Sequence, residues 1–223
     1  MTPRTDPLID LRRLSRPVPE PPAPEVDSVE RCEMCSTEIV GQHGHVADVE
    51  AHRLLCTCRA CFLLFTNARA GSGRFLSVPQ DVRRVVDVAI SEGQWAALQI
   101  PVELAFFLRQ TGAEQVGAYY PGPGGATESL LDLASWAEVL DANPVLAQAE
   151  PDVRAILLRR SPGGYACYLV PVDRCYELVG IVRQSWVGFH GGADVWRRVE
   201  DFFADLDREG RPVDRTGDAV PRG

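Results

Sequence analysis

The sequence predicts an α+β fold in which a small cysteine-rich module precedes a mixed α/β core with a mainly antiparallel sheet. Three observations lead to this prediction. Five of the seven cysteines lie within residues 30–79. Two apolar runs, Val153–Arg160 and Tyr165–Val172, flank the Ser-Pro-Gly-Gly segment Ser161–Gly164, a pattern typical of an antiparallel hairpin. A helical period of apolar residues follows Gly191.

Composition limits the classes of function. The chain of 223 residues has room for one ordinary domain and a smaller module. Its formal charge is −8, from 31 acidic and 23 basic residues, which makes nucleic acid an unlikely partner. Every basic residue is an arginine. Without lysine there is no Schiff base, no pyridoxal phosphate attachment and no phosphate-loop lysine.

The N-terminal residues do not resemble an export signal. Pro3, Asp6 and Pro7 interrupt the start of the chain, and no apolar run reaches the roughly 20 residues that cross a bilayer. We therefore expect a cytoplasmic protein without a membrane span. In that compartment the cysteines are interpreted as thiols or metal ligands rather than disulfides.

The two ends are expected to lie outside the folded regions. Residues 1–29 are predicted to be a flexible arm, with a short helix at Pro7–Arg16 and a stiff proline-rich linker at Pro17–Pro24. Residues 211–223 are polar and contain Gly and Pro, so we expect a disordered tail.

Two capping boxes predict helix starts within the core, residues 80–210. Ser91 with Gln94 opens a short helix, and Ser135 with Glu138 opens a second one.

The core also contains strand patterns and two longer helices. Leu104–Arg109 and Gln115–Tyr120 are predicted strands joined by a turn. Asp173 is predicted to cap a helix that runs through Arg183. The apolar stripe of the last helix consists of Trp196, Val199, Phe202, Phe203 and Leu206.

Two CxxC motifs carry the main functional prediction. Cys32 and Cys35 form the first pair, and Cys58 and Cys61 form the second pair. Two such turns supply four thiolates in a tetrahedron, the arrangement that zinc prefers. Between the pairs, two short strand patterns predict a hairpin. We therefore expect residues 30–79 to form a zinc-ribbon or rubredoxin-like knuckle module, stabilised by about 10–16 kcal/mol of metal binding.

The cysteine cluster leaves three alternatives open. Iron uses the same four-thiolate geometry, although rubredoxin knuckles usually have glycine where Ser36 and Phe62 stand. Cys56 lies on the same face of the predicted strand as Cys58, so it is either an alternate metal ligand or a buried thiol. His45, like His43 and His52, is an alternate ligand in place of a cysteine, although a solvent-facing histidine of the hairpin is the favoured interpretation. A thioredoxin-type redox pair is least favoured, because no βαβ pattern surrounds either motif.

A glycine-rich loop is the most unusual segment of the core. As an anion- or ligand-binding loop it would use backbone amides and two hydroxyls. The alternative is a strand-to-helix turn that needs glycine for a positive φ. The candidate residues are Gly122, Gly124, Gly125, Thr127 and Ser129.

The remaining reactive residues fit structural roles. Cys167 and Cys175 are expected to be buried thiols, and His190 is a lone histidine in a loop. No catalytic motif is recognised, which favours a binding role over an enzyme.

Five segments of the chain carry a resemblance to a known family: Cys32–Cys35, Leu55–Cys61, Gly125–Ser129, Val170–Gly180 and Gly191–Trp196. They resemble an uncharacterised actinobacterial family, a domain of unknown function encoded near genes for uptake nickel–iron hydrogenases. The resemblance covers about Arg31 to Leu206. It implies a context, the hydrogenase, and no established activity.

Three functional hypotheses follow. The first is a zinc-binding accessory protein whose protein partners are hydrogenase subunits or maturation factors, and which supports assembly, maturation or the electron path of that enzyme. The second is a rubredoxin-like iron protein that passes single electrons. The third is a nucleic-acid-binding zinc ribbon, which is least favoured because acidic residues alternate with the arginines of the module.

Overall fold

The computed structural model describes residues 29–67, 70–100, 102–113, 116–129, 133–188 and 191–221. Apart from Val29, the predicted flexible arm lies outside these residues, and so do its predicted helix and linker. Within the described part of the chain, no helix combines the length and the apolar character needed to cross a bilayer.

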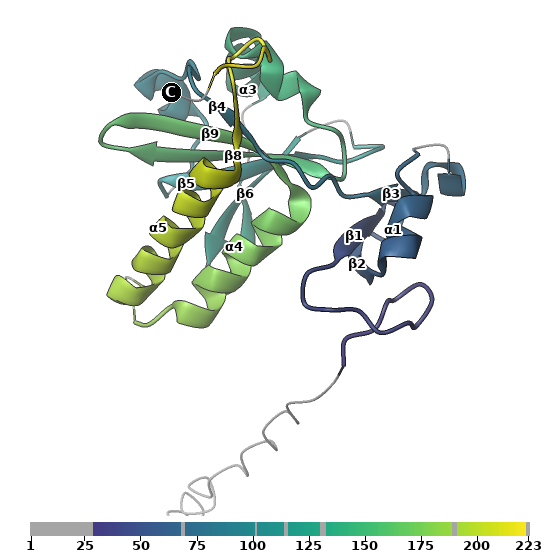
Figure 1. Ribbon diagram of the computed structural model, residues 1–223. Helices are drawn as coiled ribbons and strands as arrows, with labels where there is room; N and C mark the ends of the chain where they lie inside the picture. Colours follow the sequence, from purple (N-terminus) through teal and green to yellow (C-terminus); the bar gives the residue numbers. More distant parts are fainter. Residues whose placement is uncertain are drawn as a thin grey trace, which may run out of the picture.

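The cysteine-rich module is built on a three-stranded antiparallel sheet of order β2-β1-β3 (Figure 1). Strand β1 pairs with β2 along its whole length, which confirms the hairpin predicted between the CxxC motifs. Its elements are β1 (Gly44–Asp48), β2 (Arg53–Thr57), α1 (Arg59–Leu64), the 3-10 turn η2 (Ala70–Gly73) and β3 (Phe75–Ser77).

The core contains a seven-stranded sheet of order β10-β4-β9-β8-β5-β6-β7. Every neighbouring pair is antiparallel except β10 and β4. The predicted class, α+β with a mainly antiparallel sheet, is confirmed. The strands are β4 (Arg83–Val85), β5 (Leu104–Arg109), β6 (Val116–Gly122), β7 (Gly125–Ser129), β8 (Arg154–Ser161), β9 (Gly164–Pro171) and β10 (Arg211–Val213).

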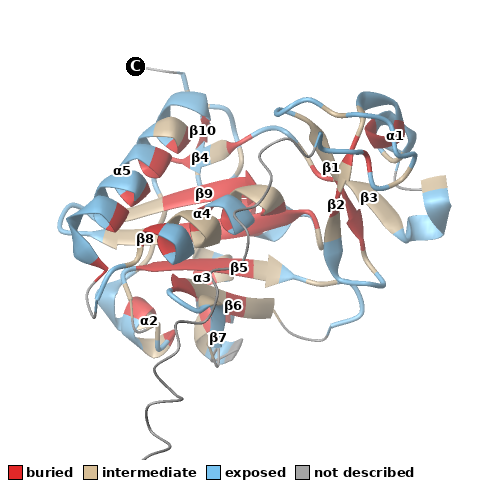
Figure 2. Cartoon of the chain, turned by 90° about the horizontal axis from the view of Figure 1, so that it is seen from below, coloured by how far each residue is buried: buried red, intermediate tan, exposed pale blue. Residues whose placement is uncertain are grey.

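Helices cover both faces of this sheet. Helices α4 and α5 lie side by side across one face (Figures 1 and 2), and the other three helical segments pack against the opposite face. The helices are α2 (Glu92–Ala97), α3 (Leu133–Ala142), the 3-10 turn η3 (Pro144–Gln148), α4 (Val172–Ser185) and α5 (Gly192–Glu209).

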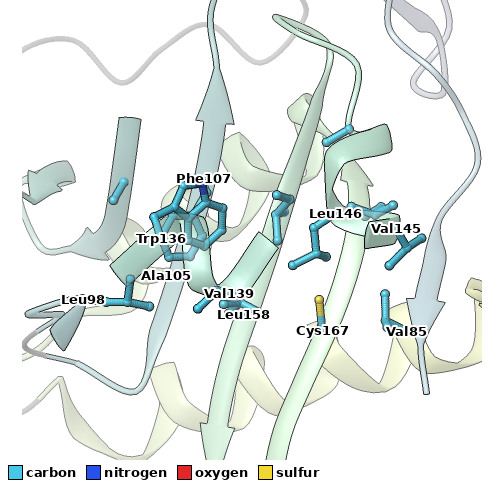
Figure 3. Close-up of a cluster of buried hydrophobic side chains, with 14 of the residues drawn as sticks. Val85, Leu98, Ala105, Phe107, Trp136, Val139, Val145, Leu146, Leu158 and Cys167 are labelled. Carbon is cyan, nitrogen blue, oxygen red and sulfur yellow. The ribbon is translucent and has the colours of Figure 1, made fainter. Parts of the chain in front are cut away.

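Strand alternation explains why the central strands are continuous apolar runs. In β5, Leu104 and Phe106 belong to the apolar cluster under α4 and α5, whereas Ala105 and Phe107 belong to the cluster on the opposite face. Successive side chains of a strand point to opposite faces, so a sheet covered on both sides needs apolar residues at every position. Figure 3 shows Phe107 stacked on Trp136 of α3, with ring centroids 4.1 Å apart.

Two of the predicted helix starts are wrong. The capping box of Ser91 and Gln94 is confirmed. Ser135, however, lies inside α3, which begins at Leu133. Asp173 lies in the first turn of α4 rather than at its cap, which is Pro171, and its carboxylate contacts His45 of the module.

The last helix and the tail also differ from the prediction. Trp196 is half exposed on α5, and Val195 takes its place in the buried stripe. The chain beyond Gly210 was expected to be disordered, but β10 pairs in parallel with β4 and buries Pro212 and Val213. The polar composition of this segment led to the wrong prediction of disorder. A three-residue strand needs no apolar core of its own when it pairs with an existing sheet.

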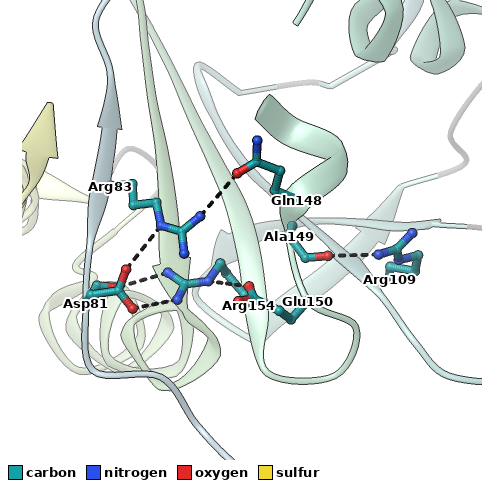
Figure 4. A network of polar contacts seen from close by, with 7 residues as sticks. All are labelled: Asp81, Arg83, Arg109, Gln148, Ala149, Glu150 and Arg154. Carbon is teal, nitrogen blue, oxygen red and sulfur yellow. Dashed lines mark hydrogen bonds and ion pairs between the residues drawn. The ribbon is translucent and has the colours of Figure 1, made fainter. Parts of the chain in front are cut away.

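The module packs directly on the core. Ala47 of β1 and Val78, just after β3, share a buried apolar cluster with Val153 and Val172 of the core. Just beyond the module, Asp81 binds the buried guanidinium of Arg154, with Nη2 2.6 Å from Oδ1 (Figure 4). The apolar cluster joins the module to the core, and the Asp81–Arg154 pair holds the start of the core chain that follows the module.

Candidate metal centre

The first CxxC motif forms a tight knuckle. The amide of Ser36 donates to the carbonyl of Cys32 at 2.7 Å, and the amide of Cys32 donates to the carbonyl of Thr37 at 2.8 Å. Ser36 has a φ of 61°, in the left-handed region that usually favours glycine. Serine therefore adopts here the backbone conformation for which rubredoxin knuckles usually have glycine.

Backbone amides surround the sulfur of Cys32. Burial opposes its ionisation, but the amides of Cys58, Cys35 and Met34 donate to the sulfur and lower the pKa of Cys32 below its usual value. Amides directed at a sulfur favour the thiolate, the form that binds metal.

The second CxxC motif begins a helix rather than forming a second knuckle. Cys58 is the residue before α1, and Cys61 lies in its first turn. Phe62 is therefore helical and buried, and it packs so closely under Gly44 that a Cβ there would lie 2.5 Å from its ring. The module thus has a knuckle, a hairpin and a short helix in chain order, with two cysteines at each end.

All four sulfurs converge. Each lies within 4.8 Å of the others, and the sulfurs of Cys35 and Cys58 are 3.6 Å apart. A tetrahedron with Zn–S bonds of about 2.3 Å places sulfurs about 3.8 Å from one another. All seven cysteines lie among the described residues and none forms a disulfide. The donor set and spacing therefore fit one tetrahedral metal ion held by Cys32, Cys35, Cys58 and Cys61.

Charge at the cluster favours a cation. The hydroxyl of Thr37 lies 3.4 Å from the exposed sulfur of Cys35, and this contact is the main reason that the pKa of Cys35 falls to about 6. Burial, together with the neighbouring sulfurs, raises the pKa of Cys61 to about 12. Four thiolates cannot coexist here without positive charge, and a divalent ion supplies it.

Cys56 and His45, the predicted alternate ligands, do not join this cluster. They face each other across the β1–β2 ladder and group with His43. Burial first, and then the charges of Glu30 and Glu33, raise the pKa of Cys56 to about 11. A search for cross-strand partners of His45 in the predicted hairpin would have found this second group.

A cleft of about 770 Å³ lies between the module and the core. Both the cysteine cluster and the second group reach it, through Cys58, His43 and His45. The core contributes Asp173, Arg174 and Glu177 of α4, and Glu209 of α5.

The glycine-rich loop is a β-hairpin. Gly122 of β6 pairs with Gly125 of β7, and Pro123 and Gly124 form the turn. Gly125 has a φ of 119°, which only glycine adopts readily. The strand-to-helix interpretation is therefore wrong. Ligand binding by Gly122, Gly124, Gly125, Thr127 and Ser129 stays a prediction.

The core cysteines have the expected environment. Cys167 and Cys175 are buried in the apolar clusters on opposite faces of the sheet, and burial raises the pKa of each thiol. Neither is placed to react. His190 lies outside the described residues.

Comparison with known proteins yields a family. The model of a family of unknown function, DUF5947, matches residues 31–210. The match begins one residue before Cys32 and ends at Gly210, so it includes the four-cysteine cluster and the core up to the residue before β10. No curated protein and no solved structure matches the chain.

Proposed function

We propose that this chain, which belongs to the DUF5947 family of unknown function, is a zinc-binding accessory protein of the cytoplasm that binds another protein. The observation that carries the proposal is the convergence of four cysteine sulfurs from a knuckle and a helix start. A zinc ion with four thiolates has no open position, so it acts by holding a fold rather than by chemistry.

Local geometry supports zinc over iron. The donor atoms suit both metals. A rubredoxin-like site takes each pair from a knuckle, whereas Cys58 and Cys61 come from the start of α1. A knuckle followed by a hairpin and a helix is an arrangement of zinc fingers. Iron remains the second candidate because Cys35 is exposed, as an electron-transfer centre requires.

Surface chemistry supports a protein partner. Three large apolar side chains of the module, Val40, Leu63 and Leu64, are exposed. Leu63 and Leu64 lie together at the end of α1, the helix that carries Cys61. Exposed apolar side chains beside a rigid, metal-held element suit a surface that another protein covers.

Nucleic acid is a weaker candidate because three arginines of the module are paired with acids. A basic face needs cationic groups that are available for phosphates. The pairs are Arg31 with Glu38, Arg53 with Glu33, and Arg74 with Asp48 and Glu50.

The resemblance to a hydrogenase-associated family names the partner to test. We expect the chain to bind a nickel–iron hydrogenase subunit or maturation factor and to support assembly, maturation or the electron path of that enzyme.

Affinity purification from the native host at natural expression level tests the partner. The bait is the wild-type chain, a Leu63→Ser/Leu64→Ser variant that keeps every cysteine, or the Cys58→Ser variant. Hydrogenase subunits or maturation factors should be enriched by the wild type and lost with both variants. Equal recovery of hydrogenase proteins with the Leu63→Ser/Leu64→Ser variant would refute the proposal that Leu63 and Leu64 of α1 contact the partner. If the wild type enriches no hydrogenase protein, this partner is refuted. The zinc site is measured separately, by metal content, and does not depend on that result.

A further inference from the structure

Two histidines and a cysteine form a second cluster of metal-ligand type. His45 of β1 pairs with Cys56 of β2, and His43 lies just before β1. One ring nitrogen of each histidine and the sulfur of Cys56 all lie within 4.8 Å of one another. The two imidazole rings are 4.9 Å apart and inclined by 58°. The cluster shares no residue with the four-cysteine group.

Both histidines are oriented through the same ring nitrogen. Nδ1 of His45 lies 2.8 Å from Oδ2 of Asp173, and Nδ1 of His43 lies 3.2 Å from the carbonyl oxygen of Val40. Metal-binding histidines are held in this way, with one nitrogen on a carboxylate or a carbonyl and the other on the metal. Because Nδ1 of each ring already has a partner, Nε2 is the nitrogen that remains for a metal.

The Nε2 atom of His43 is buried and makes no hydrogen bond, which is the strongest indication of a ligand at this cluster. The side chain of His43 is 10% exposed, and its Nε2 is buried without a hydrogen-bond partner. Buried polar atoms nearly always have a partner, and a bound ion is one recognised partner of a buried nitrogen that makes no hydrogen bond. Oδ1 of Asp173 is buried without a partner as well.

The surroundings carry negative charge. Oε2 of Glu30 lies 3.7 Å from Nδ1 of His43, and Oε2 of Glu33 accepts the amide of Cys56 at 2.6 Å. With Asp173 beside His45, three carboxylates surround the cluster, which attracts a cation.

We propose that His43, His45 and Cys56 bind a second metal ion, a late first-row divalent cation such as Zn²⁺. Two imidazoles and a thiolate suit this class of metal, and hard ions such as Mg²⁺ and Ca²⁺ prefer oxygen. His43 and His45 line the cleft between the module and the core. A site with three protein ligands keeps a fourth position for water or another ligand. Asp173 is a positioning residue that links this ion to α4.

Metal counting on the untagged full-length protein tests the proposal. After equilibration with Zn²⁺ and removal of loosely bound ions, the wild type should hold two equivalents. The His43→Gln/His45→Gln variant should hold one. The matched control is His52→Asn, which changes an exposed histidine of the β1–β2 turn and should keep two. One equivalent in the wild type, or two in the double variant, would overturn the proposal.

Two further variants separate this site from the four-cysteine site and from a folding defect. Cys35→Ser should lose the zinc of the four-cysteine site and keep the second zinc. If this variant holds no zinc, the second site is refuted, whereas the four-cysteine site is supported. Asp173→Asn keeps all three ligands and should weaken binding of the second ion about 10- to 100-fold, measured by competition with a chromophoric chelator. Unchanged affinity in that variant would refute the assigned orientation of His45.

Discussion

Asp81, two residues beyond the cysteine-rich module, neutralises a buried arginine of the core, and its removal should destabilise the protein measurably. The side chain of Arg154 is 1% exposed, and its guanidinium is neutralised by Asp81, at 2.6 Å, and by Glu150, at 2.5 Å (Figure 4). Arg154 also donates to the backbone carbonyl of Asp81 at 2.9 Å. An Asp81→Asn substitution removes one of the two negative charges and keeps the shape of the side chain.

The magnitude follows from what remains around Arg154. A buried charge that is left without any partner of opposite charge destabilises the folded state by about 3–5 kcal/mol. Glu150 still contacts Arg154 in the variant, so the loss is closer to that of one charged hydrogen bond, about 2 kcal/mol. For a chain of this size, that loss lowers the melting temperature by about 4–8 °C.

The matched control is Asp205→Asn. Asp205 resembles Asp81 in exposure, 48% against 55%, and in its distance to an arginine, 2.5 Å against 2.6 Å. Its partner Arg208, however, is 70% exposed. A surface pair contributes about 0–1 kcal/mol. Urea unfolding at neutral pH, followed by circular dichroism, measures both variants. Equal losses in the two would refute the argument that burial of Arg154 makes Asp81 important.

Four further results are expected. Burial opposes ionisation of Asp81, but Arg154 outweighs it and holds the pKa below the usual 3.8. The stabilisation is therefore present above pH 3.8 and lost as the pH falls through the lower folded-state pKa, so wild type and Asp81→Asn should converge in urea titrations only below pH 3.8. Gly44→Ala places a methyl 2.5 Å from the ring of Phe62 and should cost about 1–3 kcal/mol in the same assay, whereas Gly41→Ala, with open space around it, should not. Zinc should protect the exposed Cys35 from alkylation at neutral pH, and a chelator should remove the protection, as mass spectrometry of labelled peptides will show. Chelation should also abolish hydrogen-exchange protection in β1 and β2 but leave it in β8 and β9; equal loss in both sheets would contradict a metal-dependent module on an independent core.

Local sequence patterns were sufficient for much of the fold. The hairpin of β8 and β9 follows from two apolar runs around a Pro-Gly turn, and that of β1 and β2 from alternation between two CxxC motifs. The continuous apolar run of β5 also predicts a strand covered on both faces. These features depend on interactions between residues that are close in the chain, which a local sequence pattern predicts directly.

Features that depend on distant contacts were missed. Asp173 resembles a helix cap, but its partner is His45, 128 residues earlier in the chain. Residues Arg211–Val213 have the composition of a disordered tail, but they pair in parallel with β4 at the edge of the sheet. The second CxxC motif resembles the first, yet it starts a helix because Phe62 is buried under Gly44. In each case a tertiary contact decides between local alternatives of similar free energy.

The central claim is that one metal ion is held by Cys32, Cys35, Cys58 and Cys61. The most direct test is zinc X-ray absorption, with elemental analysis, on the His43→Gln/His45→Gln variant expressed at natural level, because that variant isolates the four-cysteine site. The account predicts one zinc per chain, no iron, and four sulfur neighbours at about 2.3 Å. Absence of metal, iron in place of zinc, or nitrogen and oxygen neighbours in the first coordination sphere would contradict it.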